Sequence, residues 1–167
     1  KCETFFNAFS FRNFFIPSSS NRLLVSADYS QIEVRLLAHF SKDSKLQQIF
    51  TSTSDGDIYK NLGGCIFRKE PGSITDTERK KAKTVTLGLI YGMGAELMAK
   101  KLSISKVEAK KIMNAFFNEF RQVQVWMQDI QLQARTNGVV STLTGRRRAI
   151  ANIKSPNHEA RSYAERQ

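Results

Sequence analysis

A short apolar run that ends at an acidic residue is the feature that most constrains the fold of this chain. Residues 23–25 read Leu-Leu-Val, Asp28 follows shortly after, and a helical pattern with a second acid, Glu33, begins at once. A carboxylate at the tip of a buried strand can hold a hard cation such as Mg²⁺, because that ion prefers oxygen ligands on a rigid support. A lone Asp in such a place more often caps the next helix, so the run by itself leaves both interpretations open.

The basic charge of the chain indicates a polyanionic partner. The 167 residues include 26 Lys and Arg against 15 Asp and Glu, which gives a formal net charge of +11. Lys and Arg that neutralise phosphates release condensed counterions, so a surface of this kind binds nucleic acid without sequence preference. A merely soluble basic protein is the alternative. Clusters of basic residues at 79–83, 100–101, 110–111 and 146–148 favour nucleic acid.

Length and composition fit one domain with a sizeable core, since 41% of the residues are hydrophobic. Cys2 and Cys65 are too few for a disulfide framework and lack a metal-ligand spacing. No apolar run approaches the ~18 residues of a membrane span, so we expect no membrane partner. Residue 167 falls inside a helical pattern without a stop signal, which predicts that the chain is part of a larger protein.

Apolar spacing predicts a mostly helical chain with a few extended segments. We expect helices over residues 30–40, 43–50, 57–66, 77–91, 105–119, 122–137 and 159–167. We expect extended segments over residues 11–17 and 22–28, and a strand pair over 139–143 and 149–153 around Gly145. Residues 52–56 are expected to be a loop.

The expected helix over residues 77–91 has two different faces. At about 100° per residue, one sector holds Ala82, Val85, Leu89 and Met93, and the opposite sector holds Lys80, Lys83, Leu87 and Tyr91 with Arg79 on its flank. A solvated basic face explains the lysines but not the apolar Leu87 and Tyr91. A triphosphate that lies along this sector accounts for all of them. Arg79 would fork onto the γ-phosphate, Lys83 would act as a point charge, and Leu87 with Tyr91 would form a wall for sugar and base.

Three blocks of this sequence resemble family A DNA polymerases. Residues 28–35 read Asp-Tyr-Ser-Gln-Ile-Glu-Val-Arg and differ from the core of the family's A motif only at Val34, where the family has Leu. Residues 79–92 match the fixed positions of the B motif except that Leu87 replaces an aromatic residue. Residues 138–148 and 164–167 resemble the segment that follows the fingers in the family. The similarity runs from about Arg12 to the last residue.

This resemblance implies an α+β, mostly helical fold made of strand segments of the palm and helical fingers of a right-hand polymerase. Residues 1–41 would be a palm segment, residues 42–137 the fingers, and residues 138–167 the return to the palm. The family's C motif, which supplies a second metal-binding Asp, is absent from these 167 residues, so we expect an incomplete catalytic centre.

The resemblance also implies the site residues. Asp28 and the backbone carbonyl of Tyr29 would hold two Mg²⁺ ions, and Asp28 and Lys83 would be catalytic. Implied nucleotide contacts are Gln31, Glu33, Arg79, Lys83, Leu87 and Tyr91, and implied DNA contacts are Gln31, Arg166, Arg146 and Arg147. In the family, the Glu at the position of Glu33 forms a hydrogen bond with the B-motif Tyr, which is Tyr91 here, and excludes a ribose 2′-hydroxyl. Tyr59 stands where bacterial members carry a phosphate-side His.

The function implied is template-directed DNA synthesis, in which deoxynucleoside triphosphates are added to the 3′-hydroxyl of a primer on template DNA. Residues 91–95 and 145–148 are most similar to the eukaryotic theta and nu branch of the family, which implies a nuclear protein in DNA repair or translesion synthesis. The alternative is a non-catalytic nucleic-acid-binding remnant, against which the intact Asp28, Arg79 and Lys83 argue. Glu33 with Tyr91 argues against a single-subunit RNA polymerase.

Overall fold

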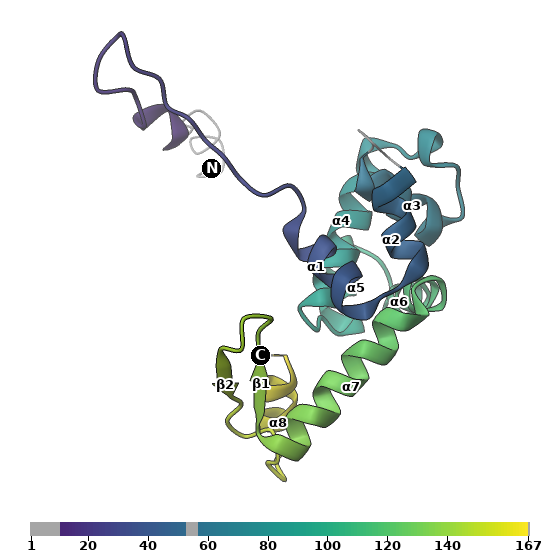
Figure 1. Ribbon diagram of the computed structural model, residues 1–167. Coiled ribbons are helices and arrows are strands. Elements are labelled where there is room, and N and C mark those ends of the chain that lie inside the picture. The colour runs from purple at the N-terminus through teal and green to yellow at the C-terminus, as the bar shows by residue number, and fades with distance from the viewer. Residues whose placement is uncertain (1–10, 53–56, 167) are drawn as a thin grey trace, which may run out of the picture. The chain divides into compact units, whose positions relative to one another are not determined.

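The computed structural model describes residues 11–52 and 57–166, which are mostly helical (Figure 1). The α-helices of this part are α1 (Ile32–Ser41), α2 (Ser44–Ser52), α3 (Ile58–Phe67), α4 (Asp76–Ile90), α5 (Ala95–Leu102), α6 (Lys106–Glu119), α7 (Arg121–Asn137) and α8 (His158–Glu165). Two 3₁₀-helices are η1 (Phe11–Phe14) and η2 (Pro71–Ser73), and β1 (Val139–Ser141) pairs antiparallel with β2 (Arg147–Ala149). By its contacts the chain divides into two units, residues 1–30 and residues 31–167. The loop expected at 52–56 lies largely outside the described residues.

The described part of the first unit contains no strand, so the prediction of a buried strand over residues 22–28 is wrong. Leu23, Leu24 and Val25 are 87%, 60% and 89% exposed. An apolar run becomes a strand only when a neighbour pairs with its N–H and C=O groups, and no described residue does so here. The extended segment expected over residues 11–17 is also wrong in its first part, where η1 forms instead.

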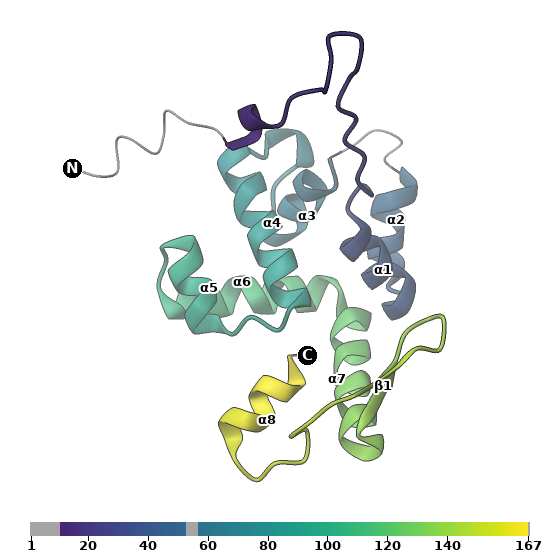
Figure 2. The same cartoon turned by 90° about the vertical axis from the view of Figure 1, so that its left-hand side faces the viewer.

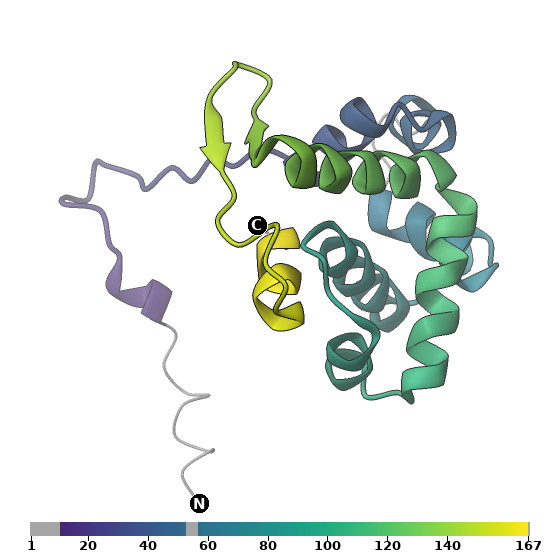
Figure 3. The same cartoon turned by 90° about the horizontal axis from the view of Figure 1, so that it is seen from below.

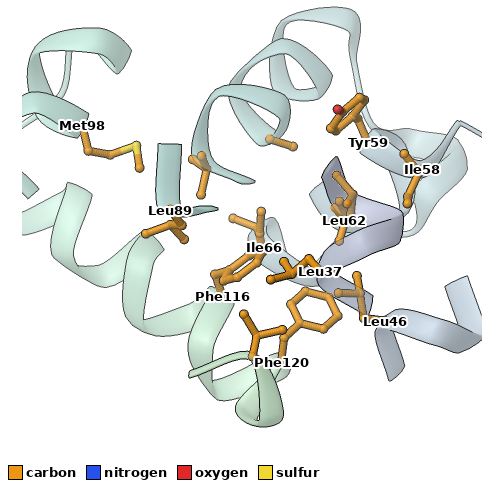
Figure 4. Close-up of a cluster of buried hydrophobic side chains, with 14 of the residues drawn as sticks. Leu37, Leu46, Ile58, Tyr59, Leu62, Ile66, Leu89, Met98, Phe116 and Phe120 are labelled. Carbon is orange, nitrogen blue, oxygen red and sulfur yellow. The ribbon is translucent and has the colours of Figure 1, made fainter. Parts of the chain in front are cut away.

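In the second unit, helices α1 to α7 share one apolar cluster (Figure 4). Its large, fully buried members include Leu46, Leu62, Val85, Phe116 and Phe120, which come from different helices or their caps. The rings of Phe116 and Phe120 lie 5.0 Å apart between centroids. Helix α4 contacts α1, α3, α5 and α6, so this core fixes the direction of α4 and thereby of its outer face.

A second, smaller cluster forms where α7 leads away from the helices to the hairpin (Figures 1 and 2). Ala134 of α7 and Ala164 of α8 pack there with Ile150 and Ile153. The strand expected over residues 149–153 is therefore misplaced, because β2 ends at Ala149 and the two isoleucines turn inward to the cluster. Gly138, with φ of 71°, ends α7 and opens β1.

The remaining helices confirm their predictions to within about two residues at each end, except that α5 was not expected. Helix α5 lies within residues 92–104. Gly92 and Gly94, at the start of this stretch, favour a break in helical structure. Gly94 has an extended φ of −78° and stands at the N-cap of α5 without a side-chain cap. The apolar side of this eight-residue helix, with Met98 fully buried, is what holds it in place.

Both ends of α4 are closed by specific hydrogen bonds. At its start, Thr75 and Glu78 form a capping box, and Lys69 Nζ donates to Glu78 at 2.6 Å. The hydrogen bonds from Lys69 and from the backbone of Thr75 lower the pKa of Glu78 to about 2. At its end, the N–H of Gly92 donates to Leu89 at 3.0 Å and the N–H of Met93 donates to Gly88 at 2.8 Å. This is a Schellman motif, in which Gly92, with φ of 69°, takes the left-handed position.

We expect Thr86→Val to raise the free energy of unfolding by ~1 kcal/mol, because a buried hydroxyl without a partner costs about that much. Thr86 is 0% exposed, and its Oγ1 is the buried side-chain oxygen that finds no hydrogen-bond partner among the described residues. Thr84→Val is the matched control, because Thr84 Oγ1 donates to the Lys80 carbonyl at 3.0 Å. Urea denaturation measures both; equal effects at the two positions would contradict the argument.

Candidate nucleotide-binding face

Helix α4 turns one side to the core and the other to solvent. Ala82, Val85 and Leu89 are 0%, 0% and 3% exposed. On the other side Lys83 and Tyr91 are exposed, and Arg79 and Leu87 are half-buried. We call Arg79, Lys83, Leu87 and Tyr91 the α4 face. The prediction of two opposite sectors is confirmed within α4, whereas Tyr91 is the C-cap residue, and Met93 lies beyond the helix end and packs on Gly88.

Arg79 is held in place by an acid from another helix. Its Nε donates to Oδ2 of Asp57, the N-cap residue of α3, and the two side chains are about one third and one quarter exposed. The other carboxylate oxygen of Asp57 accepts the backbone N–H of Tyr59 at 3.0 Å. Asp57 therefore caps α3 while it forms an ion pair with Arg79 of α4.

The aromatic ring of Tyr59 lies beneath both cations of the α4 face. Arg79 Cζ is 5.8 Å and Lys83 Nζ is 5.5 Å from the ring centroid, within the range of a cation–π interaction. Tyr59 is only 5% exposed and lies at one end of the buried cluster (Figure 4). The ring therefore belongs to the core, and the two cations converge on a rigid support.

Burial and nearby charges shift the pKa values of Asp57 and Tyr59. Burial alone would raise the pKa of Asp57, but the hydrogen bonds from Arg79 and from the Tyr59 backbone outweigh it and lower the pKa. Burial, followed by the charge of Glu33, raises the pKa of Tyr59. At neutral pH the cluster thus contains an ionised Asp57, a neutral Tyr59 and two cations.

The end of α4 meets the end of α8. A Cβ built on Gly92 would lie 2.9 Å from Cγ of Arg166, so the B-motif glycine and the Arg of the last sequence block are in direct contact. Figures 1 and 2 show α8 below α4 and α5, and Figure 3 shows that side of the molecule from below. Arg166 is exposed, and its Nη1 donates to Ser162 at 2.8 Å. The structure thus brings the predicted DNA contact Arg166 against Gly92, which follows Tyr91 in sequence, at the end of the α4 face.

Gln31 and Glu33 lie at the start of α1. Gln31 is the N-cap residue, with a left-handed φ of 54° and no side-chain cap bond. Glu33 is half-buried in the first turn and acts on the pKa of Tyr59. Within the described residues no hydrogen bond joins Glu33 to Tyr91, whose side chain is largely exposed. The role of Glu33 in excluding ribose stays a prediction.

The predicted metal ligands lie in the first unit. Asp28 and Tyr29 are exposed and belong to a segment without regular secondary structure. A carboxylate and a backbone carbonyl are the hard oxygen donors that Mg²⁺ prefers, but the ion takes about six ligands. Across residues 11–52 and 57–166, no three His, Cys, Asp or Glu side chains gather closely enough to hold a metal ion. The donor type fits the ion, and the donor set is incomplete.

The two hairpin arginines predicted to contact DNA, Arg146 and Arg147, are exposed. Arg146 is in the turn between β1 and β2, and Arg147 begins β2 opposite Ser141. Their guanidinium groups are thus available to a polyanion, and their predicted contact with DNA stays a prediction.

A cavity of about 660 Å³ lies away from the α4 face. Its walls include Leu36 and Phe40 of α1, Trp126 and Ile130 of α7, and Val140 of β1. The rings of Phe40 and Trp126 stack with their centroids 5.6 Å apart.

No helix within the described ranges combines the length and the apolar character that crossing a bilayer requires.

Sequence reasoning missed Asp57 and the use that the structure makes of Tyr59. Asp57 directly precedes a helical pattern, which signals an N-cap. Its second partner, Arg79, is 22 positions away on another helix, and no periodicity connects the two.

Comparison with known proteins decides the family. Residues 6–167 match a sequence model described as DNA polymerase family A. The chain belongs to this family. The family A chain is 39% identical over 155 residues to DNA polymerase I of Bacillus caldotenax, and 34% identical over 158 residues to DNA polymerase theta of Mus musculus. These matches cover 93% and 95% of the chain but 17% and 6% of the relatives.

A solved structure agrees with this assignment. The POL domain of Pol1 from M. smegmatis, in complex with DNA primer-template and dNTP, matches with a TM-score of 0.76 and 36% identity. The match covers 83% of the family A chain and 24% of that structure. The mostly helical polymerase fold is therefore confirmed. Because bacterial relatives are at least as similar as the theta relative, the theta and nu branch is not singled out.

Proposed function

We propose that this chain is the nucleotide-binding part of a DNA-directed DNA polymerase, which transfers deoxynucleotides to the 3′-hydroxyl of a primer on template DNA. The observation that carries the proposal is the α4 face. Arg79 and Lys83 converge over one buried ring, with Leu87 and Tyr91 continuing the same face. Membership of the family and a structural neighbour that holds DNA and dNTP support this assignment.

The residues of the α4 face suit the phosphates of a triphosphate. In the reaction, the primer 3′-oxygen bonds to the α-phosphorus while the bond from that phosphorus to the leaving oxygen breaks, and pyrophosphate departs. Negative charge grows on the leaving group, and fixed cations stabilise it best when they need no rearrangement. Arg79 presents a planar fork for a terminal phosphate, and Lys83 presents a point charge.

The apolar half of the same face suits the sugar and the base. Leu87 of α4 is half-buried, and Tyr91, the C-cap residue of α4, is exposed four positions later. We propose that they form the wall against which the deoxyribose and base rest, and that Glu33 excludes the ribose 2′-hydroxyl. Gln31, Arg146, Arg147 and Arg166 are the proposed contacts to primer-template DNA.

Magnesium dependence is part of the proposal. Asp28 and the carbonyl of Tyr29 would supply oxygen ligands for the ions, whose chemistry is to activate the attacking oxygen and to neutralise charge on the phosphates. We also propose that residues 1–41 and 138–167 belong to the palm and residues 42–137 to the fingers. A role in repair or translesion synthesis, in the nucleus, is proposed on the resemblance of residues 91–95 to the theta and nu branch.

Lys83→Ala tests the assignment of the α4 face. In the full-length protein we expect this change to weaken dNTP binding and incorporation by about 10- to 100-fold, because a charge-assisted contact is worth ~1.5–3 kcal/mol. Duplex DNA binding should change no more than about twofold, the effect of one lost surface charge among many. Single-turnover incorporation at varied dNTP concentration measures dNTP binding and incorporation. Fluorescence anisotropy with labelled DNA measures duplex DNA binding.

Lys111→Ala is the matched control, because Lys111 is an exposed lysine on α6. It removes the same charge and should leave dNTP binding unchanged. If Lys83→Ala lowered DNA affinity sharply and left the dNTP dependence intact, the α4 face would be a DNA surface. That result would also favour a nucleic-acid-binding protein without catalysis.

A further inference from the structure

We propose that Asp57 is a positioning residue that presents Arg79 to the triphosphate, and this inference rests on the proposed function of the α4 face. Asp57 lies outside the residues that the sequence motifs single out. It joins the N-terminus of α3 to the phosphate-binding side of α4 through one carboxylate.

The carboxylate of Asp57 is itself rigid. Oδ1 accepts the N–H of Tyr59 at 3.0 Å, and the Asp57 carbonyl accepts the N–H groups of Lys60 at 2.9 Å and Asn61 at 3.2 Å. An N-cap residue that makes these bonds has a fixed backbone and a fixed side-chain rotamer. Oδ2 therefore stands at a defined point next to α4.

Asp57 uses only one of the donors of Arg79. The hydrogen bond runs from Nε, and a guanidinium group carries four further N–H donors on its two terminal nitrogens. Those nitrogens are the ones that form a fork with a phosphate. The carboxylate of Asp57 thus contacts Nε and leaves the two terminal nitrogens of Arg79 to the phosphate. Asp57 therefore positions Arg79 and does not compete with the phosphate for it.

The ring of Tyr59 completes this arrangement. Arg79 and Lys83 both lie within 6 Å of its centroid, at 5.8 Å and 5.5 Å. Two cations that approach each other repel, and the negative face of the ring together with the charge of Asp57 offsets that repulsion. The cations are therefore gathered before any nucleotide arrives, so binding requires less ordering of their side chains.

Asp57→Asn separates the positioning role from the helix cap. Asn caps a helix as well as Asp does, so the start of α3 is kept while the charge that holds Arg79 is lost. In the full-length protein we expect the dNTP dissociation constant to rise about tenfold, as for the loss of one charged hydrogen bond. The maximal incorporation rate should fall less, and DNA affinity and the melting temperature should stay close to wild type.

Asp76→Asn is the matched control. Asp76 opens α4, is exposed, and acts on Arg79 through its charge without a hydrogen bond. Asp76→Asn removes the same charge as Asp57→Asn. It should change the dNTP dissociation constant less than about twofold, because exposed ion pairs contribute little. An equal effect of Asp76→Asn and Asp57→Asn would overturn the proposal, because general charge would then explain both.

A double substitution tests whether Asp57 acts through Arg79. In an Arg79→Ala background, Asp57→Asn should have no further effect on dNTP affinity. Additive effects would overturn the proposal, and so would tighter dNTP binding by Asp57→Asn alone, which would make Asp57 a competitor of the phosphate. These outcomes are distinct from failure of the proposed function, which would appear as unchanged dNTP binding by Lys83→Ala.

Discussion

Replacing Asp28 with Asn should lower the rate of nucleotide addition by about 10³-fold or more, equivalent to ~4 kcal/mol of transition-state stabilisation. The amide keeps the shape of the carboxylate but loses the charge that a divalent cation needs. DNA binding should stay within a few-fold, because the change removes no positive charge. Primer extension in the full-length protein, at saturating DNA and dNTP in Mg²⁺, measures the rate.

The control for Asp28→Asn is Asp129→Asn, which neutralises an exposed acid on α7. It should leave both the rate and the DNA affinity unchanged. Robust primer extension by the Asp28→Asn protein would show that Asp28 is not a metal ligand of the reaction.

Asp43→Ala should lower the free energy of unfolding by ~3 kcal/mol, since it removes a helix cap and a second charge-assisted hydrogen bond. Asp43 is only 4% exposed. Its Oδ1 accepts the N–H of Leu46 in the first turn of α2 at 3.0 Å, and its Oδ2 accepts the N–H of Gln122 at the start of α7 at 3.1 Å. One carboxylate thus satisfies backbone donors of two helices that are far apart in sequence.

Urea denaturation measures the effect of Asp43→Ala, and Asp129→Asn serves again as a control that should be neutral. Asp43→Asn should have an intermediate effect, because the amide keeps one acceptor and turns its NH₂ group toward a donor. A loss below about 1 kcal/mol in Asp43→Ala would mean that water replaces the carboxylate, which its burial argues against.

Helices could be predicted from this sequence because their apolar spacing is local information. The sectors of residues 77–91 show this best, since Val85 and Leu89 are buried where the spacing places them. Strand formation depends on a partner elsewhere in the chain. The run at residues 23–25 has a strand-like composition and no pairing in the described residues, so composition alone misled the prediction.

The structure shows where the residues of the candidate site lie, and the chemistry assigned to them stays a prediction. The spacing of Arg79 and Lys83 indicates a phosphate-binding face, and the structure keeps them together. The pairing of Asp57 with Arg79 depends on tertiary structure, because the packing of α3 on α4 brings the two side chains together. The pairing of Glu33 with Tyr91, which the family resemblance implies, stays a prediction. In the structure the charge of Glu33 acts on Tyr59.

The contact between Gly92 and Arg166 limits the order in which these two positions can change during evolution. Any side chain at position 92 would adopt a left-handed backbone, at ~1–2 kcal/mol for an L-residue, and its Cβ would meet Cγ of Arg166 at 2.9 Å. A smaller residue at position 166 removes the collision but not the backbone penalty. Substitution of Gly92 therefore costs less after a change at position 166, whereas Arg166 can vary while Gly92 stays.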